Sequence, residues 1–260
     1  MVQKLDYLRE TPSQTAGPFV HIGLAPGAAG FEIYANALGT DIAGPHAAGT
    51  RIRVEGIVTD GTGSPVKDVM LEAWQANAAG VYADPGATAA VEDGFRGWGR
   101  VITDFETGEW GFDTVKPGPV AAPDGQMMAP HISLWIVARG INVGLNTRLY
   151  FSDEPGANAA DPVINLIEWE SRRATLIATR SERGDLLVYR FDICLQGDAE
   201  TVFFDILPVK RQAAGPIRST LVSSRCAVTK ARPVVQTIAG NVIHSSVHAA
   251  PERSCSCNCA

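Results

Sequence analysis

The sequence predicts an all-β protein, a β-sandwich with one or two short helices. Short apolar or alternating segments recur along the chain and are separated by turns rich in glycine and proline, of which the 260 residues include 26 and 16. Helical spacing of apolar residues is clearest in residues 163–179. With 45% hydrophobic residues, the chain can bury one substantial core.

The first four strands are expected between residues 51 and 114. Residues 51–58, RIRVEGIV, alternate, with one slip at Gly56 that a β-bulge would absorb. Residues 69–75 follow after a short turn and are expected to pair with this strand. Strands at residues 98–103 and 110–114 are expected to form a hairpin, because the T-G-E between them is typical of a tight turn.

The strand of greatest interest covers residues 131–138, HISLWIVA. Its apolar side chains are nearly continuous between Pro130 and Gly140, which predicts a strand covered on both faces. His131 opens this strand after a proline-rich loop, where β-scaffolds often place a metal ligand. The remaining strands are expected at residues 147–152, 187–195 and 201–206.

Charge and hydropathy exclude several classes of function. The net charge of −6 and the pI near 5.4 argue against a nucleic-acid partner. No run of eighteen apolar residues occurs, and residues 1–9 are charged rather than typical of a signal sequence. A soluble, cytoplasmic protein without a membrane partner is therefore expected.

The chain divides at about residue 206. Residues 1–206 are expected to form one domain with an N-terminal arm, and residues 207–260 a basic, disordered extension, because the latter carry seven Lys and Arg against one Glu and no aromatic residue. Near its end, Cys255, Cys257 and Cys259 form C-S-C-N-C. This cluster is either a soft-metal site or an unselected terminal sequence, and the missing second cysteine pair favours the latter.

Three motifs together carry a family resemblance. They are W-Q-A-N followed by G-x-Y in residues 74–82, K-P-G-P in residues 116–119 and A-P-H-I in residues 129–132. With these motifs the chain resembles the intradiol ring-cleaving dioxygenases, and it is similar to the α subunit of the two-subunit members that cleave 3,4-dihydroxybenzoate. The resemblance implies the β-sandwich of that family and a reaction with O₂ that gives 3-carboxy-cis,cis-muconate.

The family's ligand set is incomplete in this chain. In the family, two tyrosines and two histidines hold non-haem ferric iron, since phenolates are hard anionic donors. Tyr82 and His131 match the first of each pair, whereas Val120 and Ser133 stand at the second positions. Because valine has no donor atom, the resemblance implies that Fe(III) is held by a β subunit, in a hetero-oligomer of αβ pairs, and not tightly by this chain. Tyr82 and His131 are then expected to hydrogen-bond each other.

The resemblance also implies contributions to the active site of the β subunit. Gly17, Pro18 and Phe19 match an element that reaches its rim, with phenylalanine where the family usually has tyrosine. Arg139 matches an arginine that approaches the site, and as a catalytic and substrate-binding residue its guanidinium would suit a ring carboxylate. Arg148 is a weaker candidate of the same kind.

Several alternatives stay open at this point. Arg139 alone could equally be a solvated residue beside a strand. His21 is interpreted as a structural or interface histidine, and Phe19 and Trp169 as exposed rings at an interface. The chain could also bind its own iron, cleave another catechol, or be a non-enzymatic β-sandwich that serves as a scaffold or binding module.

Overall fold

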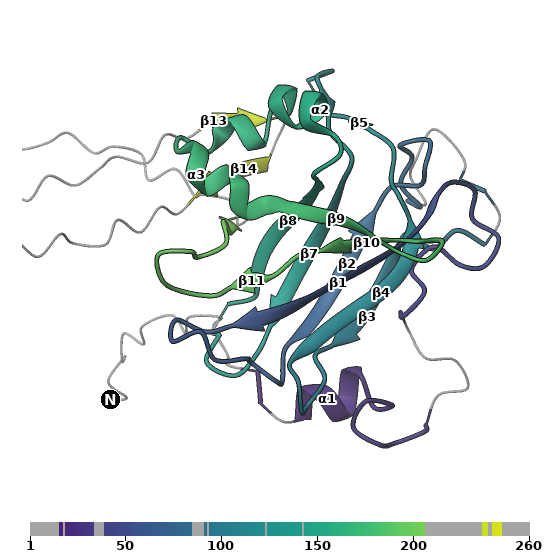
Figure 1. Cartoon of the computed structure of the whole chain (residues 1–260), viewed down its shortest axis with the longest axis vertical. Helices are drawn as coiled ribbons and strands as arrows, with labels where there is room; N and C mark the ends of the chain where they lie inside the picture. The colour runs from purple at the N-terminus through teal and green to yellow at the C-terminus, as the bar shows by residue number, and fades with distance from the viewer. Residues whose placement is uncertain are drawn as a thin grey trace, which may run out of the picture.

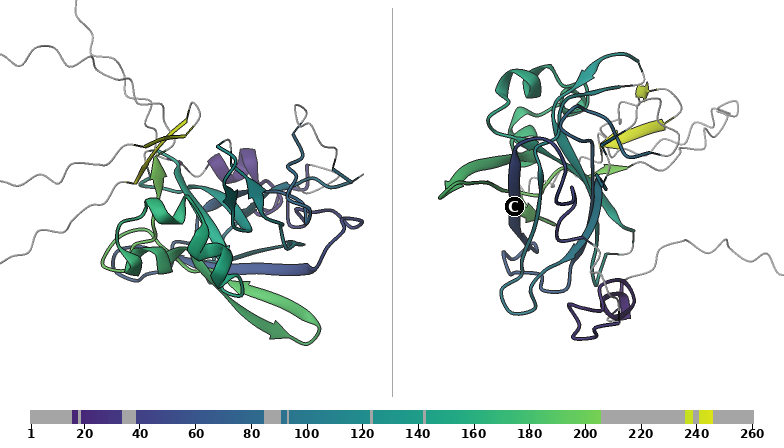
Figure 2. Two further views of the ribbon diagram at one scale, coloured as in Figure 1. Left: turned by 90° about the horizontal axis from the view of Figure 1, so that it is seen from above. Right: turned by 90° about the vertical axis from the view of Figure 1, so that its right-hand side faces the viewer.

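The computed structural model describes residues 16–17, 19–33, 39–84, 91–92, 94–122, 124–141, 143–205, 236–238 and 241–245. Two β-sheets pack face to face, with short helices at two opposite ends of the molecule (Figures 1 and 2). The predicted all-β sandwich is confirmed. Within these ranges, no helix combines the length and the apolar character that a membrane crossing requires.

The first sheet is built around β1 (Arg51–Thr59). The other strands of this sheet are β4 (Glu109–Val115), β9 (Ile177–Arg183), β10 (Leu186–Arg190) and β11 (Ile193–Cys194). Strand β1 pairs antiparallel with β4 and parallel with β10 and β11, and β10 pairs antiparallel with β9.

Gly56 lies in the regular part of β1, so the predicted slip at this residue is wrong. Every second residue of the strand is buried without interruption, and Gly56 takes one of the inward positions. A Cβ atom at Gly56 would lie 1.9 Å from the carbonyl oxygen of Phe191. The strand therefore needs glycine for a close approach of two backbones and not for a bulge.

The second sheet has β7 (His131–Val137) at its centre. The other strands of this sheet are β2 (Met70–Gln75), β3 (Trp98–Ile102), β8 (Leu145–Phe151) and β12 (Phe204–Asp205). Strand β7 pairs antiparallel with β2 and β8, β2 pairs with β3, and β8 pairs with β12. The separate hairpin of β5 (Val120–Ala121) and β6 (Met127–Met128) precedes β7.

Two predicted pairings are wrong, because consecutive strands lie in different sheets. Strand β2 pairs with β3 and β7 instead of β1, and β4 pairs with β1 instead of β3. The predicted turn after β3 does form, since the carboxylate of Asp104 accepts hydrogen bonds from the backbone amides of Glu106 and Thr107. Turn chemistry fixes the local bend. It does not determine which sheet the next strand joins.

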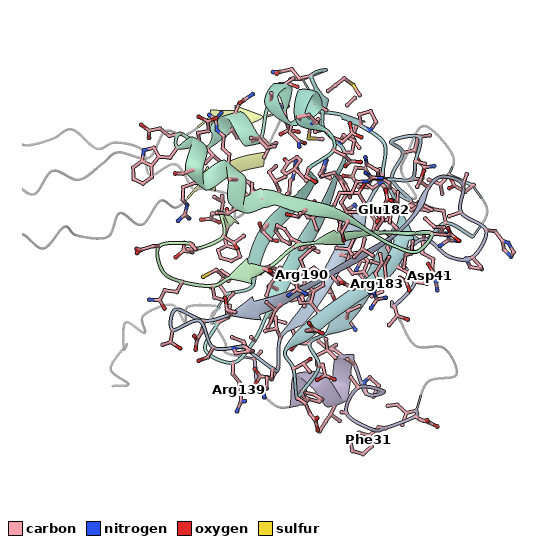
Figure 3. The ribbon with its side chains drawn as sticks, viewed as in Figure 1. Phe31, Asp41, Arg139, Glu182, Arg183 and Arg190 are labelled. Atoms are coloured by element: carbon pink, nitrogen blue, oxygen red, sulfur yellow. The ribbon has the colours of Figure 1, made fainter. Side chains whose placement is uncertain are left out.

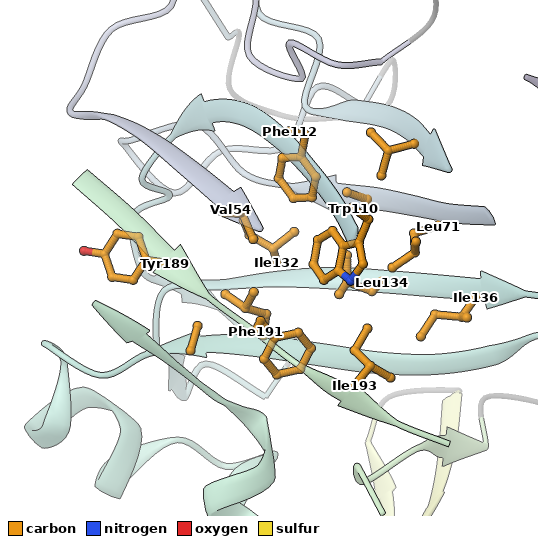
Figure 4. Packing of buried hydrophobic residues seen from close by; sticks show 14 of the residues in the cluster. Val54, Leu71, Trp110, Phe112, Ile132, Leu134, Ile136, Tyr189, Phe191 and Ile193 are labelled. Carbon is orange, nitrogen blue, oxygen red and sulfur yellow. The ribbon is translucent and has the colours of Figure 1, made fainter. Parts of the chain in front are cut away.

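The main core fills the space between the two sheets (Figure 4). Its large members include Val54, Leu71, Trp110, Phe112, Ile132, Leu134, Ile136, Tyr189, Phe191 and Ile193. At one edge the sheets are joined, because β8 pairs in parallel with β9. This closure holds the strands that carry the candidate site in a fixed relation to the core.

The helices are short and cover the two ends of the sandwich (Figure 1). At one end lie α2 (Pro155–Ala160), η1 (Ile164–Leu166), α3 (Glu170–Arg173) and η2 (Ala174–Leu176). The helical prediction for residues 163–179 is therefore confirmed up to Leu176, after which β9 begins. At the other end lies α1 (Phe19–Leu24), in the N-terminal arm.

The segment beyond β12 is described only in two short strands. Strand β14 (Asn241–Ser245) pairs with β12, and β13 (Gln236–Ile238) pairs with β14. The other residues of the expected extension 207–260, including the cysteine cluster, lie outside the described residues. Its disorder stays a prediction.

Candidate functional site

The outer face of the second sheet is partly open, so the prediction that β7 is covered on both faces is wrong. Ile132 and Leu134 point into the core, whereas Ser133 is half-buried and Trp135 is 37% exposed on the other face. A nearly continuous apolar run predicts burial on both faces, but Trp135 within this run stays partly exposed. Because tryptophan is large and rarely fully buried, this exposure leaves one face of β7 available for a site.

Tyr82 and His131 meet at one end of this outer face. The Tyr82 hydroxyl lies 3.2 Å from His131 Nε2, which confirms the predicted hydrogen bond. The Tyr82 ring is also stacked on Trp74 of β2, with ring centroids 5.9 Å apart and an angle of 9° between planes. The Tyr82 ring is therefore held by side chains from β2 and β7, which are neighbouring strands of the second sheet.

The loop that carries Tyr82 has little freedom. The Asn77 side-chain oxygen accepts hydrogen bonds from the backbone amides of Ala79 and Val81, at 3.1 and 2.9 Å. Gly80 adopts a positive φ of 79°, and a Cβ atom there would lie 2.0 Å from the carbonyl oxygen of Pro119. The G-x-Y and K-P-G-P motifs thus pack against each other, and this contact requires glycine at position 80.

The hydrogen bonds of His131 define its protonation. Its Nδ1 lies 2.7 Å from the backbone oxygen of Ala129, and a carbonyl can only accept, so Nδ1 carries the proton. Burial, aided by the positive charge of Arg148, lowers the pKa of His131 to about 3. The ring is therefore neutral, and its Nε2 accepts a hydrogen bond from the Tyr82 hydroxyl. Burial likewise raises the pKa of Tyr82, which keeps the phenol protonated.

Two fully buried residues, Tyr150 and Asp161, lie next to the Tyr82–His131 pair. Neither is among the residues predicted from the sequence. Tyr150 lies opposite His131 on β8, with ring centroids 5.8 Å apart, and its hydroxyl donates to Asp161 Oδ1 at 3.2 Å. Asp161 is fully buried and also accepts from the backbone amides of Ala129 and Val163, both at 2.8 Å. The alternation of T-R-L-Y-F-S could have placed Tyr150 on the face of His131, but nothing local connects Asp161 to them.

These residues do not fit the ferric iron that the resemblance implies. Val120 is a buried position without a donor atom, and Ser133 offers only a neutral hydroxyl. The lone pair of His131 Nε2 is used by the phenol proton of Tyr82. Within the described ranges, no three His, Cys, Asp or Glu side chains gather as a metal-binding group.

Arg148 further disfavours a metal cation at this position. It lies beside Ser133 in the register of β7 and β8, and its Nη1 atom is 3.4 Å from Met128 Sδ. Its charge acts on Tyr82, His131 and Tyr150 alike, because it lowers the pKa of each below the value that burial alone would give. A fixed guanidinium thus stands among the remnant ligand positions.

Arg139 lies at the opposite end of β7 from His131, about 25 Å away at the rise of about 3.3 Å per strand residue. Its side chain is 71% exposed, and its Nε donates to the carboxylate of Asp68. Figure 3 shows Arg139 near the end of the molecule that carries α1. The structure thus separates the predicted active-site arginine from the remnant ligands.

The N-terminal element is described in part. Gly17 is half-buried, Pro18 lies outside the described residues, and Phe19 begins α1 with a side chain that is also outside them, as is that of His21. Helix α1 is tied to the second sheet, because Arg100 Nη1 of β3 donates to the Leu24 carbonyl at 2.9 Å. Helix α1 therefore lies at the end of the molecule that carries Arg139.

Comparison with known proteins agrees with this architecture. A family model described as Dioxygenase (Dioxygenase_C) matches residues 34–197. The chain is 52% identical to the protocatechuate 3,4-dioxygenase alpha chain of Pseudomonas putida, over 77% of this chain and 98% of that one. It is 45% identical to the alpha chain of Burkholderia cepacia, over 76% and 98%.

A beta chain is also similar, at a lower level. The protocatechuate 3,4-dioxygenase beta chain of Burkholderia cepacia is 37% identical over 57% of this chain and 66% of that chain. The stronger match, both in identity and in coverage, is with the alpha chains. The chain belongs to the intradiol ring-cleaving dioxygenase family, within its group of protocatechuate 3,4-dioxygenase alpha chains.

Proposed function

We propose that this chain is the α subunit of a protocatechuate 3,4-dioxygenase and that it acts only together with a β subunit that binds Fe(III). One observation carries the proposal: in a chain 52% identical to an alpha chain, Tyr82 and His131 hydrogen-bond each other instead of forming a ligand set. The named beta chain at 37% identity supports a second, related subunit as the partner.

The reaction is the cleavage of 3,4-dihydroxybenzoate between its two hydroxylated carbons. Both atoms of O₂ enter the product, 3-carboxy-cis,cis-muconate, in which each of these carbons becomes a carboxylate. Ferric iron held by the partner subunit would supply the activation of the catechol and of O₂. Because this chain lacks a fitting ligand set, its own contribution is limited to binding and orienting the substrate in the site of the partner.

Arg139 is the residue of this chain that we assign to substrate binding and catalysis. A guanidinium stays charged at every relevant pH and presents paired donors to a carboxylate such as the one on the substrate ring. Its side chain is exposed, and the ion pair with Asp68 supports it from one side. Gly17, Pro18 and Phe19 are assigned to the rim of the same site, which agrees with the position of α1 near Arg139.

A hetero-oligomer of αβ pairs requires an extended contact surface on this chain. Trp169, which begins the segment of α3, is 50% exposed and supports the predicted interface at that end. Large exposed rings of this kind are typical of surfaces that associate with a partner.

Co-expression with a β chain tests the proposal. Iron and O₂ consumption with 3,4-dihydroxybenzoate are measured for this chain alone, for the β chain alone and for the purified pair. We expect near-stoichiometric iron and ring cleavage in the pair and no tightly held iron in this chain alone. A firmly bound ferric ion in the isolated chain contradicts the proposal, and a stable chain that never associates with a ferric partner favours the scaffold alternative.

A further inference from the structure

A cavity of about 240 Å³ lies on the outer face of the second sheet, over the middle of β7, where Ser133, Leu134 and Trp135 line it. Its walls come from β2, β3, β7, β8 and β12. The residues that matter for recognition are Trp74, Trp98, Ser133, Trp135, Arg148 and Phe204. Four of these residues are aromatic, and the guanidinium of Arg148 supplies a positive charge.

Arg148 is the unusual member of this wall. It is half-buried, and in the described part of the chain it forms no ion pair with a carboxylate, whereas Arg51, Arg53, Arg100 and Arg139 each do. Its hydrogen bonds go to Met128 Sδ, a poor acceptor, and to the side chain of Tyr150, and neither partner carries a negative charge. A partly desolvated cation without a counter-charge is unfavourable, and an anion that enters the cavity would stabilise it.

The other charged residue of the cavity, Glu72, does not neutralise the positive charge of Arg148. Glu72 of β2 lies opposite Trp135, two residues along the sheet from the row that contains Trp74, Ser133 and Arg148. Its carboxylate is 2.5 Å from Arg100 Nη2. Arg100 in turn covers the ring of Trp98, with its guanidinium carbon 5.3 Å from the ring centroid. The charge of Glu72 is thus neutralised by its neighbour, and the cavity retains the positive charge of Arg148.

We propose that this cavity binds a small aromatic carboxylate without any metal, with Arg148 as the charge partner and the tryptophan rings as the walls. The volume is below the range of about 300 to 1,000 Å³ that holds drug-sized ligands, so a single substituted ring is the largest suitable ligand. The carboxylate accepts hydrogen bonds from the Arg148 guanidinium and the Ser133 hydroxyl. The ring packs against Trp74, which already stacks on Tyr82.

This site is independent of the proposed function, because it lies over the middle of β7, where Ser133, Leu134 and Trp135 line it. Arg139 is not among its lining residues, and the site needs no iron.

The test uses 4-fluorobenzoate, observed by ¹⁹F NMR, with the purified full chain and with the αβ assembly. This probe has no adjacent hydroxyls, and paramagnetic broadening distinguishes any molecule near the iron of the partner from one in an iron-free cavity. 4-Fluorobenzamide serves as the uncharged matched probe. We expect the carboxylate to bind both preparations and the amide to bind at least about tenfold more weakly, since charge-assisted hydrogen bonds are the stronger ones.

Two variants test the residues. Arg148→Gln should weaken 4-fluorobenzoate binding at least about tenfold, and Arg180→Gln on the first sheet should leave it unchanged. Ser133→Leu keeps the charge but fills the cavity, so it should also abolish binding, and it decides the matter if Arg148→Gln does not fold. Unchanged binding in a folded Arg148→Gln or Ser133→Leu chain overturns the proposal. Equal binding of the amide overturns it too, and so does a cavity that binds in the isolated chain but is closed in the assembly.

Discussion

The Tyr82 hydroxyl donates a hydrogen bond to Nε2 of His131 at 3.2 Å, and this contact joins a loop to a strand 49 residues later in the chain. In the family both side chains would direct these same atoms to iron. Here the donor of one satisfies the acceptor of the other, and the Nδ1 proton of the histidine is bound by the Ala129 carbonyl. The pair thus stabilises the fold through its hydrogen bonds, and its removal should affect stability more than metal content.

Tyr82→Phe removes the hydroxyl and leaves His131 Nε2 buried without a donor. A buried polar group that loses its partner costs about 1 to 3 kcal/mol, so we expect the free energy of unfolding to fall by that amount. Urea denaturation measures it. Ser133→Ala is the matched control, because it removes a hydroxyl from the same face and should change stability by less than about 0.5 kcal/mol. Equal stability of Tyr82→Phe and wild type would contradict the role given to this hydrogen bond.

The protonation of His131 makes stability depend on pH. Burial holds its pKa at about 3 in the folded protein, against a usual value of 6.5. Between these values the unfolded chain binds a proton that the folded chain does not. Stability therefore falls as pH falls through this window, by about 1.4 kcal/mol per pH unit from this residue.

His131→Gln tests the pH dependence, since the amide can still accept from Tyr82 but does not titrate. The slope of the unfolding free energy between pH 6 and pH 4 should be smaller in the variant by about the stated amount, while above pH 7.5 the two proteins should have the same slope. Identical slopes in the two proteins would show that His131 is protonated in the folded state.

The features that were predicted correctly are those that a local sequence pattern determines. Alternation located most of the strands, and the predicted hydrogen bond between Tyr82 and His131 forms. Prediction failed where partners are distant, as for the pairing of β2 with β7 and the contacts of Asp161 with Ala129 and Tyr150. No local pattern encodes which strand lies in which sheet, because that choice depends on the summed burial of the two layers.

Gly56 gives a third prediction, on the fold itself. A methyl group at this position would lie 1.9 Å from the Phe191 carbonyl oxygen and 3.1 Å from the Trp110 ring, so backbone or core must move. We expect Gly56→Ala to lower the free energy of unfolding by about 3 kcal/mol. Gly156→Ala is the matched control, because nothing lies within 4 Å of the added atom and the residue is helical. That variant should be neutral or up to about 1 kcal/mol more stable.

Arg139→Ala tests the proposed contribution of this chain to catalysis. In the αβ assembly we expect kcat/KM for 3,4-dihydroxybenzoate to fall about a hundredfold, a loss of about 2.7 kcal/mol typical of a charge-assisted contact. Cleavage of catechol, which has no carboxylate, should change by less than threefold, so the ratio of the two substrates identifies a carboxylate contact. Arg180→Ala, an exposed arginine on β9 of the first sheet, should alter neither substrate. If both substrates lose activity equally in Arg139→Ala, the residue supports the fold or the subunit contact and not the substrate, and Arg139 is then removed from the active site.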